Sequence, residues 1–410
     1  MTNNKLTTRE FLVPFVLITA LFFLWGMAHG MLDVLNKHFQ EILHLTKAKS
    51  GLIQFAMYMA YFLMALPAGY FMRRFGYRKG IILGLSLFAL GSLMIAATTG
   101  FESFWLFLIF LFMLGCGLAT LETAANPYTT KLGPSESGER RINFSQSFNG
   151  LAWTVGPLIG IFIYQNNTGV EGQKLQSLML PYLVIGLIVL VVALIFVFTK
   201  LPEINEDNDD SNSVVVSQKP LIKDRHLVLG VVAQFSYCAA QTGIFSYLIN
   251  YLTDKNQPIN FDVSYGPYLL SIGFALFMIG RMSGSFMMKF FKPTKMLAFY
   301  AVMCVALLPL VSMNLGWVSI VSLFGIFFFM SIMFPTIFAL AIKDLGSKTK
   351  KASSYIIMSI VGGAVFPPLM GYVADATHSM SIGFLAPIPF FVYILYYAVS
   401  GHKIQTNSLS

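Results

Sequence analysis

The chain has 410 residues, of which 56% are hydrophobic and 11% are charged, and its mean hydropathy is +0.70. Soluble domains carry about 25% charged residues, so most of this chain cannot face water. The net charge of +9 does not indicate nucleic-acid binding, because the basic residues gather at the ends of apolar segments. The composition predicts an all-α membrane protein that is surrounded by a lipid bilayer.

Twelve apolar segments follow one another along the sequence. A membrane-crossing helix needs about 20 predominantly apolar residues, and backbone polar groups in lipid must be satisfied within the helix. We therefore predict twelve transmembrane helices. The segments are 11–39, 52–72, 80–98, 103–130, 142–164, 180–199, 227–252, 265–290, 296–313, 317–342, 352–373 and 382–399.

An acidic stretch divides these segments into six and six. Five Asp and Glu residues lie within 203–210, beside Asn, Ser and Gln. This composition predicts an N-terminal six-helix bundle at 1–201, a cytoplasmic linker at 202–225 and a C-terminal six-helix bundle at 226–410. Motifs after the second segment and in the fifth segment recur 215 and 211 residues later. The two halves are therefore expected to be pseudo-symmetric repeats, as in many secondary transporters.

The Lys and Arg residues are unevenly distributed between the two sides of the predicted membrane. With the N-terminus in the cytoplasm, the inside regions hold 21 of the 27 and the outside loops hold 5. Cytoplasmic loops carry an excess of Lys and Arg, so both termini and the linker are predicted to be cytoplasmic. The remaining residue, Arg281, lies within the eighth segment. It either reaches the cytoplasmic interface or holds an anionic substrate.

Two acidic residues lie deep within apolar segments, Asp33 in the first and Glu122 in the fourth. A charge near the bilayer centre costs about 2.5–3.5 kcal/mol on insertion scales, and desolvation disfavours the ionised form of a carboxyl group. Such a group can hold a proton at neutral pH and release it when a cavity opens to water. We predict a proton-coupling role for both residues; a structural hydrogen bond to a neighbouring helix is the alternative.

Polar and aromatic residues share faces on five predicted helices, because residues three or four apart lie on one side of a helix. Amides donate to and accept from hydroxyl groups, and aromatic rings pack on the apolar side of a sugar. Together these faces predict a sugar-binding cavity, although each residue alone could instead hold helices together. The faces hold Trp25, His29 and Asp33; Gln54, Tyr58 and Tyr61; Glu122 and Asn126; Gln146, Asn149 and Trp153; and Gln234, Tyr237, Cys238 and Gln241.

Other kinds of chemistry have no support in the sequence. The six histidines lack metal-ligand spacing, and no phosphate-binding GxxxxGK[ST] motif is present. All three cysteines lie in apolar segments, so we expect no disulfide framework. We therefore predict no metal, no cofactor and no enzymatic activity.

The sequence resembles the major facilitator superfamily over nearly its whole length. The motif LETAANP and a downstream Q-x-F-N lie within 117–150, and FLWGMAHGMLDVL lies within the first segment. These motifs resemble the fucose:proton symporter family of bacteria. The resemblance implies a monomeric, multi-pass protein of the bacterial inner membrane that works by alternating access. It also implies that Asp33 and Glu122 serve proton coupling and sugar recognition, and that Gln146 and Asn149 belong to the sugar cavity.

The sequence departs from that family in two places. His29 and Gly30 stand where the fucose symporter has asparagines, so glucose, galactose, mannose and amino sugars remain open as substrates. The basic loop after the second segment resembles the superfamily's loop signature, but Arg73 replaces its usual acid. The resemblance implies a gating role for the basic residues of this loop, Arg73, Arg74 and Arg78.

The sequence thus predicts a proton-coupled symporter for a hexose, deoxyhexose or amino sugar. Glu122 is expected to carry the proton and Asp33 to link it to the substrate. An acidic sugar such as sialic acid, with Arg281 and His29 as its cations, and coupling to sodium are the alternatives. A membrane sugar sensor would need a larger cytoplasmic output domain than the linker and tail provide. The expected substrate contacts are Trp25, His29, Asn126, Gln146, Asn149, Gln234 and Gln241.

Overall fold

The structure is a computed structural model that describes residues 6–42, 47–98, 101, 103–165, 176–199, 201–202, 221–254, 257–262 and 265–404. The side chains of 33–42, 47–51, 159–165, 176–178 and 347 lie outside this description. The main helices are α1 (Leu12–Ile42), α2 (Lys47–Thr98), α3 (Phe104–Lys131), α4 (Gly138–Gln165), α5 (Gln176–Phe198), α6 (Arg225–Leu252), α7 (Gly266–Met287), α8 (Pro293–Ser312), α9 (Trp317–Met330), α10 (Met333–Ala341), α11 (Thr349–Met358), α12 (Gly362–Ala376), α13 (Met380–Gly383) and α14 (Ile388–Tyr396).

The helices account for the predicted membrane segments. In the described part of the chain, 10 helical stretches are long and apolar enough to span a membrane. One of them, α2, contains two predicted segments, because the chain stays helical through the basic loop except at Gly76. The φ of 84° at Gly76 is a backbone conformation that favours glycine. The remaining segment is α4, whose 28 residues carry many polar side chains.

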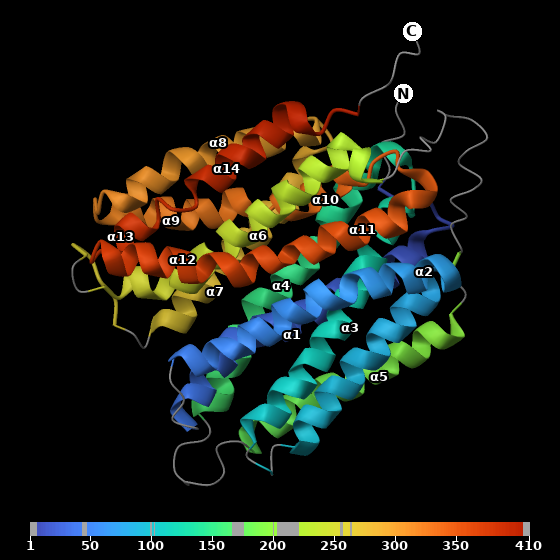
Figure 1. Ribbon diagram of the computed structural model, residues 1–410, viewed down its shortest axis with the longest axis horizontal. Coiled ribbons are helices and arrows are strands. Elements are labelled where there is room, and N and C mark those ends of the chain that lie inside the picture. The colour runs from blue at the N-terminus through green and yellow to red at the C-terminus, as the bar shows by residue number, and fades with distance from the viewer. Residues whose placement is uncertain are drawn as a thin grey trace.

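The helices form two bundles that lie side by side (Figure 1). We call α1–α5 the N-terminal helices and α6–α14 the C-terminal helices. Within the first group α1 packs along α4, and α2 packs along α3 and α5; within the second, α6 packs against α10, α12 and α14. The two groups meet where α4 lies against α7 and α2 lies against α11.

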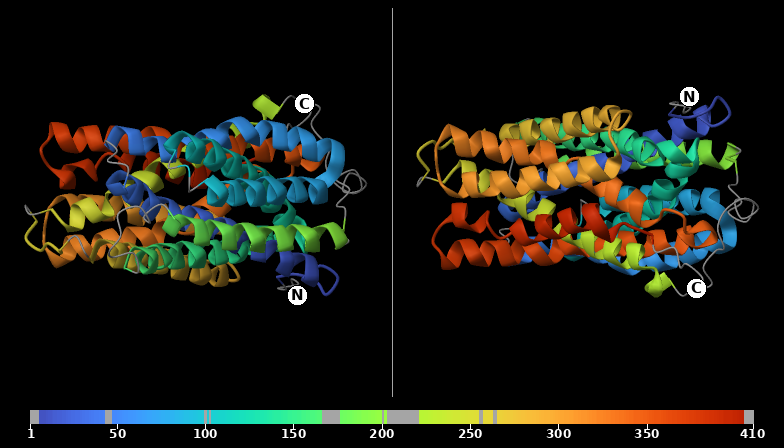
Figure 2. Two further views of the ribbon diagram at one scale, coloured as in Figure 1. Left: turned by 90° about the horizontal axis from the view of Figure 1, so that it is seen from below. Right: turned by 90° about the horizontal axis from the view of Figure 1, so that it is seen from above.

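Both chain ends lie at the same end of the molecule, as the two further views also show (Figure 2). We call this the terminal end. The side chain of Thr7 bonds to the carbonyl of Leu132 there, and Arg78 bonds to the carbonyls of Phe196 and Val197. The loop between the second and third spans therefore lies at the same end as the first residues of the described chain.

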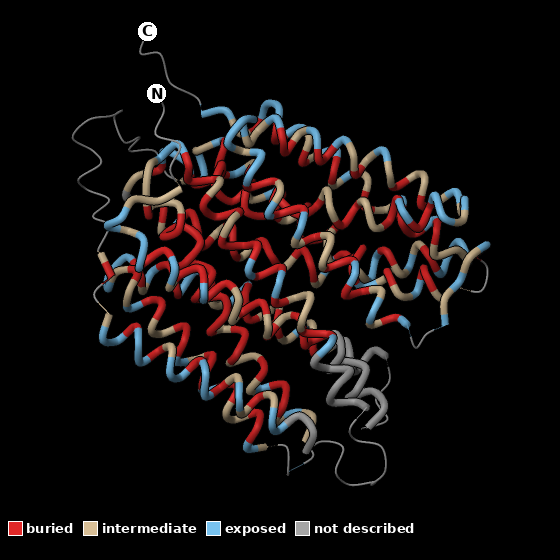
Figure 3. The backbone as a smooth tube through the Cα atoms, turned by 180° about the vertical axis from the view of Figure 1, so that it is seen from behind, coloured by how far each residue is buried: buried red, intermediate tan, exposed pale blue. Residues whose placement is uncertain are grey.

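The outer faces of the bundles are apolar. Buried residues follow the sides where helices face one another, and exposed residues follow the outside (Figure 3). The mean hydropathy of α5 reaches 3.0 over a span that is only 28% buried. Its exposed residues include Leu187 and Val191. Such a surface suits hydrocarbon, where the helical backbone satisfies its own polar groups.

Two glycines bring α1 and α4 into backbone contact. A Cβ atom on Gly156 would lie 2.6 to 2.8 Å from backbone atoms of Gly30. Backbone atoms cannot turn aside as a flexible side chain can. Small residues of this kind allow close helix packing in membranes, and here they fix the position of α1 beside the residues of α4 that face the centre of the molecule.

We expect Gly156→Ala to destabilise the protein by about 1–3 kcal/mol, the usual cost of overpacking. The added methyl group must push α1 away from α4. Thermal unfolding of the purified protein in detergent measures the effect. Gly325→Ala is the matched control, because its Cβ would meet only the Leu307 side chain, at 3.2 Å. Equal melting temperatures for the two variants would contradict the expectation.

Candidate functional site

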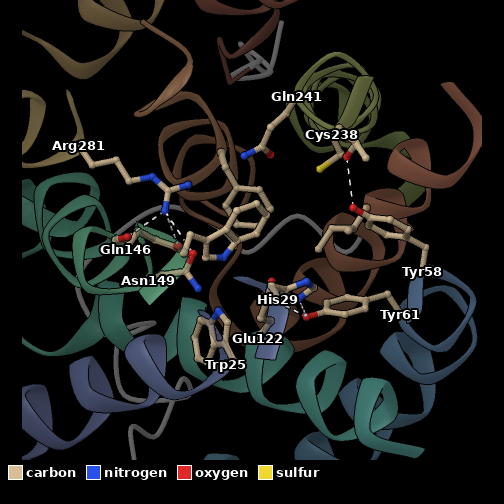
Figure 4. Close-up of a pocket in the computed structure, with 14 residues that line it drawn as sticks. Trp25, His29, Tyr58, Tyr61, Glu122, Gln146, Asn149, Cys238, Gln241 and Arg281 are labelled. Carbon is tan, nitrogen blue, oxygen red and sulfur yellow. Dashed lines mark hydrogen bonds between the residues drawn. The ribbon is translucent and has the colours of Figure 1, made fainter. Parts of the chain in front are cut away.

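A polar cavity lies between the two groups of helices (Figure 4). It receives side chains from α1, α2, α3 and α4 on one side and from α6, α7, α10 and the 3-10 helix Ser359–Val361 on the other. Six of the residues predicted to carry the proton or bind substrate line it: Trp25, His29, Glu122, Gln146, Asn149 and Gln241. The other lining residues are Tyr58, Tyr61, Trp153, Cys238, Thr242, Arg281, Phe334 and Ile360.

Glu122 is the carboxyl group of this cavity. It lies in α3 and is 6% exposed. Tyr61, from α2, donates its hydroxyl to Oε1 of Glu122 at 2.9 Å. Nε2 of His29, from α1, lies 2.9 Å from the same hydroxyl. A continuous hydrogen-bonded row therefore joins three helices of the N-terminal group.

Aromatic rings cover one wall of the cavity. The ring of His29 stacks on Trp153 with a centroid distance of 5.7 Å. Trp153 in turn packs edge-on against Phe245 and Phe274 of the C-terminal helices, at 5.8 and 5.3 Å. Its indole Nε1 is buried and has no hydrogen-bond partner among the described residues. Trp153 thus contacts both groups of helices and carries an unused donor beside the cavity.

Arg281 links the two halves at the cavity. It lies in α7, is 3% exposed, and packs over the Phe277 ring at 4.4 Å. Its Nη1 donates to the carbonyl and the side-chain oxygen of Gln146, at 2.8 and 3.0 Å, and lies 3.5 Å from Oδ1 of Asn149. No carboxylate of the described residues lies within ion-pair distance of it. The prediction left open whether this residue reaches the interface; it instead holds two cavity amides.

A proline explains why the backbone carbonyl of Ser331 is free to accept a hydrogen bond from Arg281. Nε of Arg281 donates to the carbonyl of Ser331 at 2.7 Å. In an unbroken helix this carbonyl would accept from the residue four positions later, which is Pro335 and has no N–H. The sequence predicted one helix at 317–342, whereas the chain forms α9 and α10 with a break between them. The freed carbonyl lies at that break.

Two predicted substrate residues lie behind the cavity wall. Asn126 is fully buried, and its Oδ1 accepts from Nε2 of Gln146 at 3.3 Å, so it orients a cavity amide from behind. Its Nδ2 has no partner among the described residues. Gln234 is also fully buried, beside Cys238, and does not line the cavity. The backbone of Asp33 belongs to α1, but its side chain lies outside the described residues.

The loop arginines make contacts within their own half. Arg73 and Arg74 pack over the rings of Tyr70 and Phe75. Arg78 anchors the end of α5 through the carbonyls described above. Their gating role stays a prediction.

Contacts that do cross between the halves at the terminal end involve other residues. Lys343 pairs with Glu139 at 3.2 Å. Asn143 donates to Thr336 at 3.1 Å, and Ser285 donates to the carbonyl of Arg140 at 3.1 Å. Ser353 donates to the carbonyl of Thr123 at 2.9 Å. These bonds close the terminal end of the interface between the halves.

Several lining residues were missed by the sequence reasoning. Tyr58 and Tyr61 lay on one of the polar faces that predicted the cavity, but they were not named among the expected substrate contacts. Tyr58 lies 3.3 Å from Thr242 across the interface between the halves. Phe334 and Ile360 gave no signal, because an apolar residue on an apolar helix cannot be assigned to a cavity without knowing its neighbours.

A helical membrane protein with a polar cavity between two packed halves has the architecture of a secondary transporter. The sequence matches the Major Facilitator Superfamily over residues 16–367. The chain is 37% identical to the L-fucose-proton symporter of Escherichia coli strain K12, with 98% of this chain and 95% of that protein covered. The chain therefore belongs to the Major Facilitator Superfamily, and within it to the family of that symporter.

Other similarities agree with this assignment. The glucose/galactose transporter of Brucella abortus is 34% identical, with 98% of both chains covered. A crystal structure of the transporter FucP in the outward conformation aligns with a TM-score of 0.85 and 37% identity, covering 97% of this chain and 100% of that one. The proton:xylose symporter XylE aligns with a TM-score of 0.76 at 12% identity, covering 93% of this chain and 94% of that one, which shows the shared fold alone. The predicted twelve-helix fold with two six-helix halves is confirmed.

Proposed function

We propose that the protein is a proton-coupled symporter of a neutral sugar that works by alternating access. The observation that carries the proposal is the single cavity in which the buried carboxyl of Glu122 lies with the amides of Gln146, Asn149 and Gln241. Amides and the indole N–H of Trp153 match the mixed donors and acceptors of a sugar. Among the relatives, the L-fucose-proton symporter supports proton coupling. That symporter and the glucose/galactose transporters support a sugar as the substrate.

The proton would be carried by Glu122. A buried carboxylate is costly in this setting unless it is neutralised. Protonation from outside would let the loaded cavity pass through the occluded state without a net negative charge. Asp33 would link the proton to the substrate from α1. Gln146, Asn149 and Gln241 would bind sugar hydroxyls directly, and Asn126 would orient Gln146.

The moving parts would be the two halves. We take 1–201 and 226–410 as two six-helix bundles, joined by a linker at 202–225, that rock about the cavity. Both ends of the chain would lie on the cytoplasmic side of a bacterial inner membrane, in agreement with the Lys and Arg distribution. The terminal end would then be the cytoplasmic gate, closed by the Glu139–Lys343 pair and its neighbouring hydrogen bonds. The protein would act as a monomer.

A second candidate is transport of an acidic sugar. Arg281 favours it, because this guanidinium lines the cavity and its polar contacts among the described residues are to uncharged oxygens. An anionic substrate would supply the missing carboxylate. The neutral-sugar proposal ranks first because the same guanidinium already makes several hydrogen bonds within the protein.

Uptake into liposomes that contain the purified protein tests both candidates. Labelled neutral hexoses, deoxyhexoses, amino sugars and sialic acid are offered with an inward proton gradient, with that gradient collapsed, and with a sodium gradient alone. We expect accumulation of a neutral sugar that stops when the proton gradient is collapsed. Accumulation of sialic acid only would support the second candidate. Accumulation driven by sodium alone would contradict the proton coupling.

A further inference from the structure

The hydroxyl of Tyr61 occupies a position between two titratable side chains. It lies 2.9 Å from Oε1 of Glu122 and 2.9 Å from Nε2 of His29. Tyr61 is fully buried, and Glu122 is nearly so. His29 is partly exposed and lines the cavity. The row therefore runs from the cavity wall at His29 to the buried carboxyl at Glu122.

The three groups constrain one another's protons. A phenol has one proton to donate, and a neutral imidazole has one donor and one acceptor nitrogen. When Glu122 is ionised it can only accept, so Tyr61 donates to it and Nε2 of His29 donates to Tyr61. When Glu122 is protonated it can donate to Tyr61, and Tyr61 can donate to Nε2 of His29. Protonation of Glu122 thus permits both hydrogen bonds to reverse direction.

We propose that His29 is the residue through which protons from the cavity reach Glu122, with the hydroxyl of Tyr61 as the bridge. A proton binds Nδ1 of His29 from the cavity side. The Nε2 proton passes to Tyr61, and the Tyr61 hydroxyl proton passes to Oε1 of Glu122. His29 ends neutral with its proton on Nδ1, Tyr61 ends neutral, and Glu122 has gained one proton. The inference rests on the proposed proton coupling.

The surroundings of His29 favour the transfer of a proton through this residue over the retention of a proton on it. The facing charged group is Arg281, from α7, whose field acts on Glu122. A positive charge held at His29 would be disfavoured because the His29 side chain is only partly exposed to water. The other titratable groups that face the carboxyl are Tyr58 and Tyr61 from α2 and Cys238 from α6. Asp33 follows His29 by one turn in α1, with its side chain outside the described residues.

Two conservative variants separate the relay from a structural role. Tyr61→Phe keeps the ring and removes the bridging hydroxyl. His29→Asn keeps a neutral hydrogen-bond donor but cannot take up a proton at physiological pH. Both are reconstituted in liposomes with the wild type, Glu122→Gln and the control Tyr58→Phe, which removes from the same cavity wall a hydroxyl that lies 3.3 Å from Thr242. Each protein is tested for the initial rate of proton-driven uptake, final accumulation and sugar counterflow.

We expect Tyr61→Phe and His29→Asn to lower the initial rate of proton-driven uptake by about a hundredfold, the lower part of the range for a positioned proton donor. Counterflow needs no net proton movement, so the ratio of proton-driven uptake to counterflow should fall in both variants by about the same factor. Their final accumulation should approach the wild-type value, because Glu122 still binds the proton. The ratio of proton-driven uptake to counterflow in Tyr58→Phe should match the wild type.

The outcomes distinguish the relay from the proposed function. Wild-type initial rates in both variants, or an equal loss of counterflow and uptake, would refute the relay while accumulation by the wild type still supports symport. A wild-type protein that accumulates no sugar on a proton gradient would refute the proposed function and the relay with it.

Discussion

Replacing Glu122 by glutamine is expected to abolish accumulation of the sugar and to leave exchange intact. Glutamine retains an oxygen that can accept from Tyr61 at the position of Oε1, but it cannot bind or release a proton. One charge moved across 100 mV supplies about 2.3 kcal/mol. Since about 1.4 kcal/mol corresponds to a tenfold ratio, the wild type can concentrate sugar about 50-fold, and the variant should reach a ratio of about one.

Two measurements on the same liposomes check this expectation. Net uptake is followed under an imposed gradient, and counterflow is followed without one. Glu136→Gln is the matched control, because Glu136 is an exposed carboxyl in the loop before α4. Full accumulation by Glu122→Gln would exclude Glu122 as the coupling group and direct attention to Asp33. Loss of counterflow as well would show that the carboxyl serves binding or folding.

Replacing Arg281 by glutamine should weaken sugar binding by about 10- to 100-fold. Hydrogen bonds that involve a charged group contribute about 1.5–3 kcal/mol each, and Arg281 holds the side chains of Gln146 and Asn149 in place. Without it these amides lose their common orientation, and the carbonyl of Ser331 is left without its side-chain donor. Arg281→Lys should fail to restore binding, because lysine lacks the planar fork that reaches several oxygens.

Binding is measured on purified, folded protein by equilibrium titration with the sugar identified from the uptake panel. Thermal unfolding of the same samples separates lost affinity from lost structure. Arg225→Gln is the control, because the contact of Arg225 with Tyr396 is exposed and distant from the cavity. Unchanged affinity in Arg281→Gln would show that Arg281 serves only to join the halves. Selective loss of an acidic sugar would support the second candidate function.

Sequence reasoning identified the helices and a large part of the cavity for physical reasons. A long apolar segment is enough to predict a membrane span. Glu122 stood out because a carboxyl at mid-bilayer depth is costly and usually has a function. Helical spacing then placed Gln146 and Asn149 on one face. Helical spacing shows which residues share a face but not what that face contacts. Asn126, one turn beyond Glu122, was therefore expected at the sugar, but it contacts Gln146 from behind.

The spacing of residues along one helix could not predict contacts between distant segments. The bridge from His29 to Glu122 needs Tyr61 of another helix, at a distance set by the packing of α1 and α2 against α3. The position of Arg281 depends on the carbonyl that Pro335 frees. Proline was visible in the sequence, but which donor would reach the freed carbonyl depended on how α7 and α10 pack.

The bonds that close the terminal end are mostly uncharged. Ser285, Ser353 and Asn143 make single hydrogen bonds there, each of which contributes about 0.5–1.5 kcal/mol. The Lys343–Glu139 ion pair of the described residues has a lysine that is 49% exposed, and such pairs contribute about 0–1 kcal/mol. Thermal fluctuation can therefore break the closure one bond at a time. As a symporter the protein would not be held closed at this end by these bonds alone, and the direction of net transport would be set by the sugar and proton gradients together.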